Sequence, residues 1–117
     1  MIDYKVAKGL DKLHDARKIR EIVFVKEQGF VVEFDDIDES ATHVLLTING
    51  NPAATGRVFP KEDGVYILGR IAVLPQYRGR DLGRILVGKL EEVAKSNNAR
   101  TAVLSAQVRV KEFYEKM

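Results

Sequence analysis

The segment that decides the fold is residues 71–84, which read Ile-Ala-Val-Leu-Pro-Gln-Tyr-Arg-Gly-Arg-Asp-Leu-Gly-Arg. It joins the end of a strand pattern to the start of a helix pattern, and residues 78–84 contain two glycines and three arginines. Free N–H groups at a helix N-terminus bind anions, and glycine lets the anion approach the backbone. Arginine adds charge-assisted hydrogen-bond donors. The segment therefore predicts a cradle for a pyrophosphate group.

Two other phosphate-binding loops do not fit this spacing. A P-loop needs G-x-x-x-x-G-K-S/T, and the stretch from Gly79 to Gly83 has neither that spacing nor the lysine. A dinucleotide-binding fold needs G-x-G-x-x-G and an acidic residue about 20 positions further on, which is also absent. A helix start that carries solvated arginines stays open as the plainer alternative.

The sequence after this segment predicts a βαβ unit. Apolar residues recur at helical spacing from about Arg80 to Ser96, and Asn97-Asn98 is a helix stop signal. The small apolar run from Thr101 to Ala106 predicts a strand buried on both faces and parallel to the strand that ends near Val73. Residues 109–117 predict one more helix.

The sequence before the segment predicts a helix inside an antiparallel meander. Apolar residues at helical spacing run from Leu10 to Val23, and an acidic loop follows from Lys26 to Ser40. The strands are expected at Ile2–Ala7, His43–Ile48, Ala53–Phe59 and Val65–Val73, with a hairpin turn at Asn49-Gly50. The fold class is therefore α/β (α+β): a mixed sheet with an antiparallel meander, then a βαβ unit, and helices on both faces.

Composition limits the function classes. A chain of 117 residues predicts one domain over residues 1–117. The absence of cysteine excludes a thiol nucleophile, a thiolate zinc site and a disulfide framework, and favours a cytoplasmic location. Neither a signal peptide nor an apolar run of membrane-spanning length is present, so no membrane partner is expected. The net charge of +2 is too small to indicate bulk nucleic-acid binding, and no aromatic stacking platform accompanies the arginines.

Residues 76–81, Gln-Tyr-Arg-Gly-Arg-Asp, resemble the acetyl-CoA motif Gln/Arg-x-x-Gly-x-Gly/Ala of the GNAT N-acetyltransferase superfamily. The preceding residues 71–75 and the later pairs Ala106-Gln107 and Phe113-Tyr114 look like the same family. Residues 24–28, together with Asp38 and His43, are similar to its ElaA-like branch. The resemblance covers nearly the whole chain.

The resemblance implies a GNAT-like sheet in which the strands near Val73 and Leu104 splay apart around the pantetheine arm of acetyl-CoA. Gly69 is the expected bulge in the first of these strands. An amine of a small molecule or protein would attack the thioester directly, without a covalent enzyme intermediate. The residues expected to bind acetyl-CoA are Ile71, Ala72, Val73, Gln76, Arg78, Gly79, Arg80, Asp81, Leu82, Gly83 and Arg84.

The resemblance also implies a catalytic residue, Tyr114, which would protonate the departing CoA thiolate. A phenol has a pKa close to that of an alkyl thiol, so this proton transfer carries no large penalty. The alternative is that Phe113-Tyr114 only packs a terminal helix against the sheet. The general base is left open among five residues, each of which has a solvated loop role as its alternative: Glu27, Glu33, Asp35, Asp38 and His43. His14, on a polar helix face, is expected to be uninvolved.

Two features depart from the family pattern. Asp81 stands where the motif has glycine or alanine, and its carboxylate could cap the helix or repel the pyrophosphate. Family members continue after the Phe-Tyr pair with Gly-Phe and two strands, whereas this sequence stops at Met117. The domain is thus expected to be short at its C-terminal end, or to be covered there by a second chain, as in a homodimer. A non-catalytic acyl-CoA binding or sensing module is the alternative function.

Overall fold

The computed structural model describes residues 2–27, 29, 36–62 and 64–104. Within them the chain forms one mixed sheet with the strand order β1-β2-β3-β4-β5. The first four strands are antiparallel neighbours, and β5 pairs in parallel with β4. The strands span Ile2–Lys8 (β1), Thr42–Ile48 (β2), Asn51–Glu62 (β3), Val65–Val73 (β4) and Thr101–Leu104 (β5). The predicted meander and βαβ unit are confirmed.

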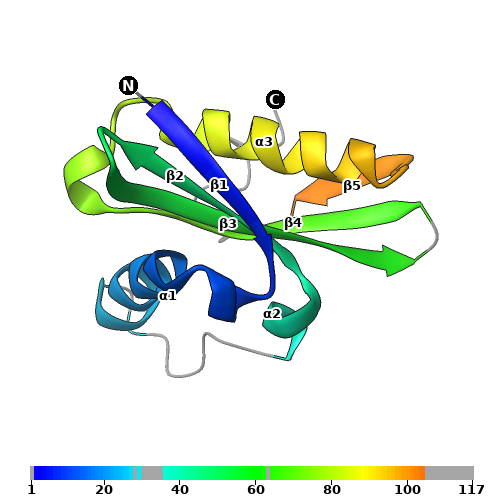
Figure 1. Ribbon diagram of the computed structural model, residues 1–117, viewed down its shortest axis with the longest axis horizontal. Coiled ribbons are helices and arrows are strands. Elements are labelled where there is room, and N and C mark those ends of the chain that lie inside the picture. The colour runs from blue at the N-terminus through cyan, green and yellow to red at the C-terminus, as the bar shows by residue number, and fades with distance from the viewer. Residues whose placement is uncertain (1, 28, 30–35, 63, 105–117) are drawn as a thin grey trace.

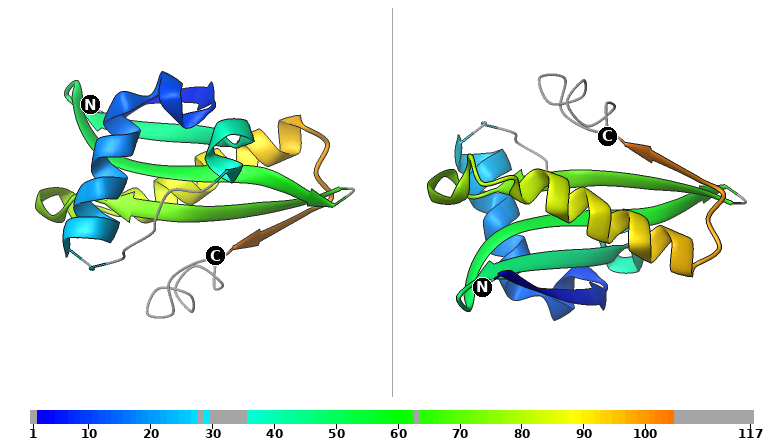
Figure 2. Two further views of the ribbon diagram at one scale, coloured as in Figure 1. Left: turned by 90° about the horizontal axis from the view of Figure 1, so that it is seen from below. Right: turned by 90° about the horizontal axis from the view of Figure 1, so that it is seen from above.

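Helices cover both faces of the sheet, as the sequence predicts (Figure 1). The long helix α3 lies along one face, and α1 and α2 lie on the other (Figure 2). The helical segments are η1 Leu10–Lys12, α1 His14–Arg20, the π-helical η2 Glu21–Glu27, α2 Ile37–Ser40, η3 Pro75–Tyr77 and α3 Leu82–Ser96. None of these helices combines the length and the apolar character needed to cross a membrane.

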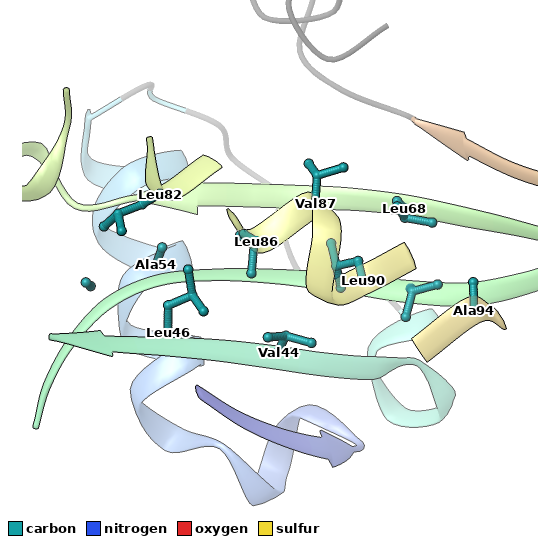
Figure 3. Packing of buried hydrophobic residues seen from close by; sticks show 11 residues of the cluster. Val44, Leu46, Ala54, Leu68, Leu82, Leu86, Val87, Leu90 and Ala94 are labelled. Atoms are coloured by element: carbon teal, nitrogen blue, oxygen red, sulfur yellow. The ribbon is translucent and has the colours of Figure 1, made fainter. Parts of the chain in front are cut away.

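Each face of the sheet has its own hydrophobic core. Leu82, Leu86 and Leu90 of α3 pack against Val44, Leu46 and other residues of β2 to β4 (Figure 3). On the opposite face, α1 buries Ala16 and Ile19 with Leu45 and Ala72 of the sheet. A Cβ at Gly56 would lie 2.9 Å from a Leu90 methyl carbon, so this glycine lets α3 lie close to the sheet. The two cores hold β4 and the start of α3 in fixed positions.

Several sequence expectations need correction. The strand from Thr101 is not buried on both faces, because β5 pairs only with β4 among the described strands and its residues 101–103 are exposed. The helical segment expected to end near Val23 continues as a π-helix to Glu27, and a short helix, α2, lies within the expected loop. The helix expected from Arg80 begins at Leu82, since Asp81 has a left-handed backbone.

The β-bulge in β4 lies one step beyond the predicted position. Gly69 pairs regularly with Arg57, and Ala72 pairs with Thr55. Arg70 and Ile71 therefore lie opposite the single residue Gly56, and Arg70 has a φ of +51°. A bulge of this kind bends the strand and redirects its backbone groups. It lies directly before the segment that leads to α3.

Candidate functional site

Two left-handed residues shape the loop between η3 and α3. Gly79 has a φ of +83° and Asp81 a φ of +59°. Glycine adopts this conformation freely, and aspartate is among the few other residues that tolerate it. A Cβ at Gly79 would meet no described atom within 4 Å, so the space beside its backbone is open. The loop thus presents bare main chain at the entry to α3.

The amides at the start of α3 point along the helix axis without partners inside the helix. The first helical hydrogen bond runs from the Ile85 N–H to the Asp81 carbonyl, at 3.1 Å. The N–H groups of residues 82–84 precede it, and the Asp81 carboxylate makes no capping hydrogen bond. Amides of this kind, with the helix dipole, make this helix start a candidate anion site. The Arg78 amide is not part of it, because it donates to the Pro75 carbonyl at 3.3 Å.

The three arginines of residues 78–84 differ in their side-chain contacts. Arg78 binds the Glu27 carboxylate with both terminal nitrogens, at 2.7 and 2.6 Å, and this hydrogen bonding raises the pKa of Arg78 above its usual value. Arg80 lies over the Tyr77 ring, 5.6 Å from its centroid. Arg84 is exposed in the first turn of α3. Arg80 and Arg84 therefore remain as the cations next to the amides.

The outer edge of β4 presents backbone groups beside this loop. The Leu74 N–H donates to the Ala53 carbonyl at 2.9 Å, so the Val73 carbonyl in the same peptide unit points away from β3. Ile71, two residues earlier, has its backbone groups on the same side. The Arg78 side chain already uses this outer edge, since its Nε donates to the Val73 carbonyl at 3.1 Å. The described part of β5 ends opposite Leu68, which leaves residues 69–73 of β4 without a described partner on that side.

The other residues of the predicted binding set contribute in different ways. Leu82 and Ala72 are both 2% exposed, and their side chains belong to the two cores. Gly83 is half-buried in the first turn of α3, whereas Gln76 is exposed in η3. The structure thus brings the predicted set together around one strand end and one helix start. It assigns Leu82 and Ala72 to packing, so only their backbone can face a ligand.

A buried ionic cluster lies on the α1 face of the sheet. The Asp38 carboxylate accepts hydrogen bonds from Arg20, at 2.6 and 3.1 Å, and from Arg57, at 2.9 Å. All three side chains are at most 6% exposed. This cluster fixes α2 to α1 and β3, and removing one member of such a group costs several kcal/mol because it leaves a buried charge uncompensated.

His43 lies beside this cluster and is fully buried. Its Nε2 lies 3.0 Å from the Asp38 carbonyl, to which it donates as a neutral imidazole, and its Nδ1 has no hydrogen-bond partner among the described groups. Burial lowers the pKa of His43, and it outweighs the hydrogen bond to Asp38, which raises it. The expectation that Asp38 and His43 are solvated loop residues is therefore wrong, and neither can take a proton from a solvent-side amine. Glu27, the third described candidate for the base, is bound to Arg78.

The sequence analysis did not identify Arg20 and Arg57 as members of a buried cluster. Arg20 lies seven residues after Leu13 and four after Ala16, both of them core residues, so its position on the buried helix face was readable. Arg57 lies two residues after Thr55 in a strand and shares its face. The signal in the sequence was that a charged residue falls on an otherwise apolar face.

Several predicted features lie outside the described residues: Tyr114, Glu33 and Asp35, the end of the 101–106 strand and the 109–117 helix.

Comparisons with known proteins identify a matching family and similar structures. The profile of the "Acetyltransferase (GNAT) family" matches residues 10–117. The chain is 34% identical over 113 residues to the uncharacterised N-acetyltransferase YjcF of Bacillus subtilis, covering 95% of this chain and 80% of that protein. A solved structure from Lactobacillus plantarum has a TM-score of 0.86 at 26% identity, over 98% of this chain and 82% of that one. Escherichia coli ElaA has a TM-score of 0.85 at 25% identity, over 99% and 85%.

Proposed function

The chain belongs to the acetyltransferase (GNAT) family, and we propose from this that residues 1–117 bind acetyl-CoA and transfer its acetyl group to an amine by direct attack. The observation that carries the proposal is the open loop at Gly79 followed by the uncapped amides of residues 82–84. These groups fit a pyrophosphate, since they combine open space beside the Gly79 backbone with uncapped N–H donors at a helix N-terminus. The absence of cysteine supports a cytoplasmic location.

Acetyl-CoA would lie along two features of the site. Its pyrophosphate would bind the amides of residues 82–84, with Arg80 and Arg84 supplying positive charge. Its pantetheine arm would follow the outer edge of β4, where Ile71 and Val73 direct backbone groups away from β3. The Arg78 bond to the Val73 carbonyl leaves the N–H groups of Ile71 and Val73 as the donors on that edge. Gln76, which is exposed in η3, would lie at the rim of the proposed acetyl-CoA site.

Acetyl transfer needs an acid that protonates the departing thiolate and a group that accepts the proton of the attacking amine. We assign the acid to Tyr114, whose phenol can return a proton to a thiolate of similar basicity. Because Asp38 and His43 are buried and Glu27 is paired with Arg78, no described carboxylate or imidazole in the candidate set is free to act as the base. Glu33 and Asp35 remain as candidates, and an amine that reaches the site already neutral would need neither.

The test is to measure both binding and turnover. Calorimetry with acetyl-CoA, CoA and ATP is expected to show binding of the first two and not of ATP. Release of free CoA in the presence of small polyamines, aminoglycosides, amino acids and lysine peptides is expected to identify an acceptor class. Saturable acetyl-CoA binding without CoA release by any amine would instead favour the non-catalytic module, for which Asp81 beside the anion site is the supporting observation. Absence of acetyl-CoA binding would contradict both functions.

A further inference from the structure

The outer edge of β1 carries an unusual row of exposed apolar side chains. Ile2, Tyr4 and Val6 are 47%, 47% and 46% exposed and alternate along the strand, so they lie on one face. β1 pairs with β2 on one side, and no other described strand pairs with it. In Figure 1 it lies in front of the other strands, at the edge of the sheet. Open strand edges with apolar residues are sites of strand addition.

The backbone of β1 is directed so that a further strand can be added. The Tyr4 N–H donates to the carboxylate of its neighbour Asp3, at 2.8 Å. An N–H used in this way faces the open side of the strand, and the backbone groups of Ile2 and Val6 face the same side because direction alternates with each residue. Asp3 thus occupies this backbone donor in the single chain, and a strand that adds to β1 would displace the Asp3 carboxylate from it. Positions 2, 4 and 6 are those that can form hydrogen bonds with an incoming strand.

The sequence of β1 is complementary to itself in one antiparallel register. When Tyr4 lies opposite Tyr4 of a second copy, Ile2 faces Val6 and Asp3 faces Lys5, and the same pairs recur on the other side of the two-fold axis. Positions 2, 4 and 6 then form the hydrogen-bonded pairs. Asp3 and Lys5 form the non-hydrogen-bonded pairs, in which side chains approach most closely. Apolar pairs gather on one face and ion pairs on the other.

We propose that two copies of this chain associate through β1 in this register and form one continuous sheet. The axis is perpendicular to the sheet, so α3 of both copies lies on the same face. Lys89 of α3, whose Nζ is 4.3 Å from the Tyr4 ring centroid, borders the apolar pairs. The outer edge of β4 is the opposite side of the sheet in strand order, so the association leaves it open. The proposal is therefore independent of the proposed acetyl transfer.

The interface uses one strand per copy and is small, so the dimer is expected to be weak and concentration-dependent. Sedimentation velocity of the chain from about 1 µM to about 500 µM is expected to show a monomer–dimer equilibrium in this range. Asp3→Lys and Lys5→Asp each place like charges opposite one another twice, and each is expected to weaken the dimer at least tenfold. Lys95→Asp, the same charge change as Lys5→Asp on an exposed residue of α3, serves as the control and is expected to leave the dimer unchanged.

A mixture of the two variants makes the test specific for the register. A chain with Asp3→Lys and a chain with Lys5→Asp are complementary, so mixing them is expected to restore the dimer as a heterodimer. The double variant Asp3→Lys/Lys5→Asp is expected to dimerise like the parent. A chain that stays monomeric throughout the concentration range would overturn the proposal. So would a dimer that both single variants leave intact, since it would use another surface, and so would a mixture that fails to associate. Far-UV circular dichroism of each variant confirms that the monomer is folded.

Discussion

Arg78 joins the Glu27 carboxylate to the end of β4: its terminal nitrogens bind Glu27 at 2.7 and 2.6 Å, and its Nε binds the Val73 carbonyl at 3.1 Å. Glu27 is the last residue of η2, and Arg78 directly precedes Gly79. One guanidinium therefore connects the π-helical segment, the strand edge and the loop that leads to α3. In the protein without a ligand, the Glu27 carboxylate therefore offsets the positive charge of Arg78.

Replacing Glu27 by glutamine is expected to tighten acetyl-CoA binding. The change removes a negative charge near the anion site and leaves Arg78 uncompensated, which we expect to lower the dissociation constant by about two- to fivefold at low salt. Since both side chains are more than one-third exposed, the free energy of unfolding should fall by no more than about 1 kcal/mol. Calorimetry at low and high salt checks the effect, which should shrink as salt screens the charges.

The control for this prediction is Glu91→Gln, the same charge change on an exposed residue of α3 further from its N-terminus. It is expected to leave the affinity for acetyl-CoA nearly unchanged. Weaker binding by Glu27→Gln would show instead that the ion pair positions the loop for the ligand.

Gly79→Val is expected to abolish acetyl-CoA binding while the domain stays folded. Valine would place a β-branched side chain in the open space beside the backbone, where the phosphate approaches. The φ of +83° adds a conformational cost of about 1–2 kcal/mol. Gly88→Ala is the matched control, because an added Cβ there also meets no described atom but lies inside a helix. It should raise the free energy of unfolding by about 0.5–1 kcal/mol and leave binding intact. If Gly79→Val bound acetyl-CoA with the affinity of the parent, the loop would not be part of the binding site.

Tyr114→Phe is expected to lower kcat by about 10²–10⁴-fold with little change in acetyl-CoA affinity, since only the hydroxyl is lost. Phe113→Leu is the control, because it alters the neighbouring aromatic ring without touching the phenol. Steady-state kinetics with the acceptor found in the amine panel, combined with calorimetry, provide the two readouts. A variant with parental kcat would assign Tyr114 to packing.

The regular parts of the fold were predictable because their signals are local. Asn49-Gly50 is a hairpin turn by sequence, and both residues have a positive φ in the structure, at 51° and 85°. The bulge was placed at Gly69, whereas the left-handed residue is Arg70, whose type gives no such signal. The strand from Thr101 looked buried because its residues are small and apolar, but burial depends on what covers a strand.

Part of the candidate site was also predictable, because its signal is local. The residues of the candidate anion-binding loop are contiguous in the sequence, so one local motif was enough to propose them. The cluster of Arg20, Asp38 and Arg57 joins residues 18 and 19 positions apart, and only the packing of α1 and α2 on the sheet brings them together. Asp38 was therefore interpreted as a solvated carboxylate when it is a buried structural one.

The buried His43 predicts a loss of stability in mild acid. Its pKa is lowered in the folded state, so the unfolded chain binds a proton at a higher pH than the folded chain does. The free energy of unfolding should thus fall as pH drops below about 6.5, by up to about 1.4 kcal/mol per pH unit, until the folded-state pKa is reached. Denaturant unfolding between pH 8 and pH 5 measures this slope. His43→Gln should flatten it. An unchanged slope in His43→Gln would assign the acid sensitivity to other groups.

Asp81 stands where the acetyl-CoA motif that residues 76–81 resemble has glycine or alanine, and the structure changes what its replacement should do. Its side chain makes no capping hydrogen bond, and its backbone is left-handed at φ 59°. Glycine adopts this conformation without strain, and alanine does not. Asp81 directly precedes the amides of residues 82–84, and a negative charge there would oppose the effect of the helix dipole on an anion.

Asp81→Ala, Asp81→Asn and Asp81→Gly should all tighten acetyl-CoA binding by about 1 kcal/mol, because each removes the charge. Their stabilities should differ. Alanine in a left-handed conformation should lower the free energy of unfolding by about 1 kcal/mol, a cost that comes from the backbone and not from a lost cap. Asparagine tolerates this conformation and should stay within about 0.5 kcal/mol of the parent. Calorimetry and denaturant melts on the three variants separate charge from conformation. Weaker binding by Asp81→Asn would mean that the carboxylate helps to hold the ligand, and equal stability of the alanine and asparagine variants would contradict the conformational argument.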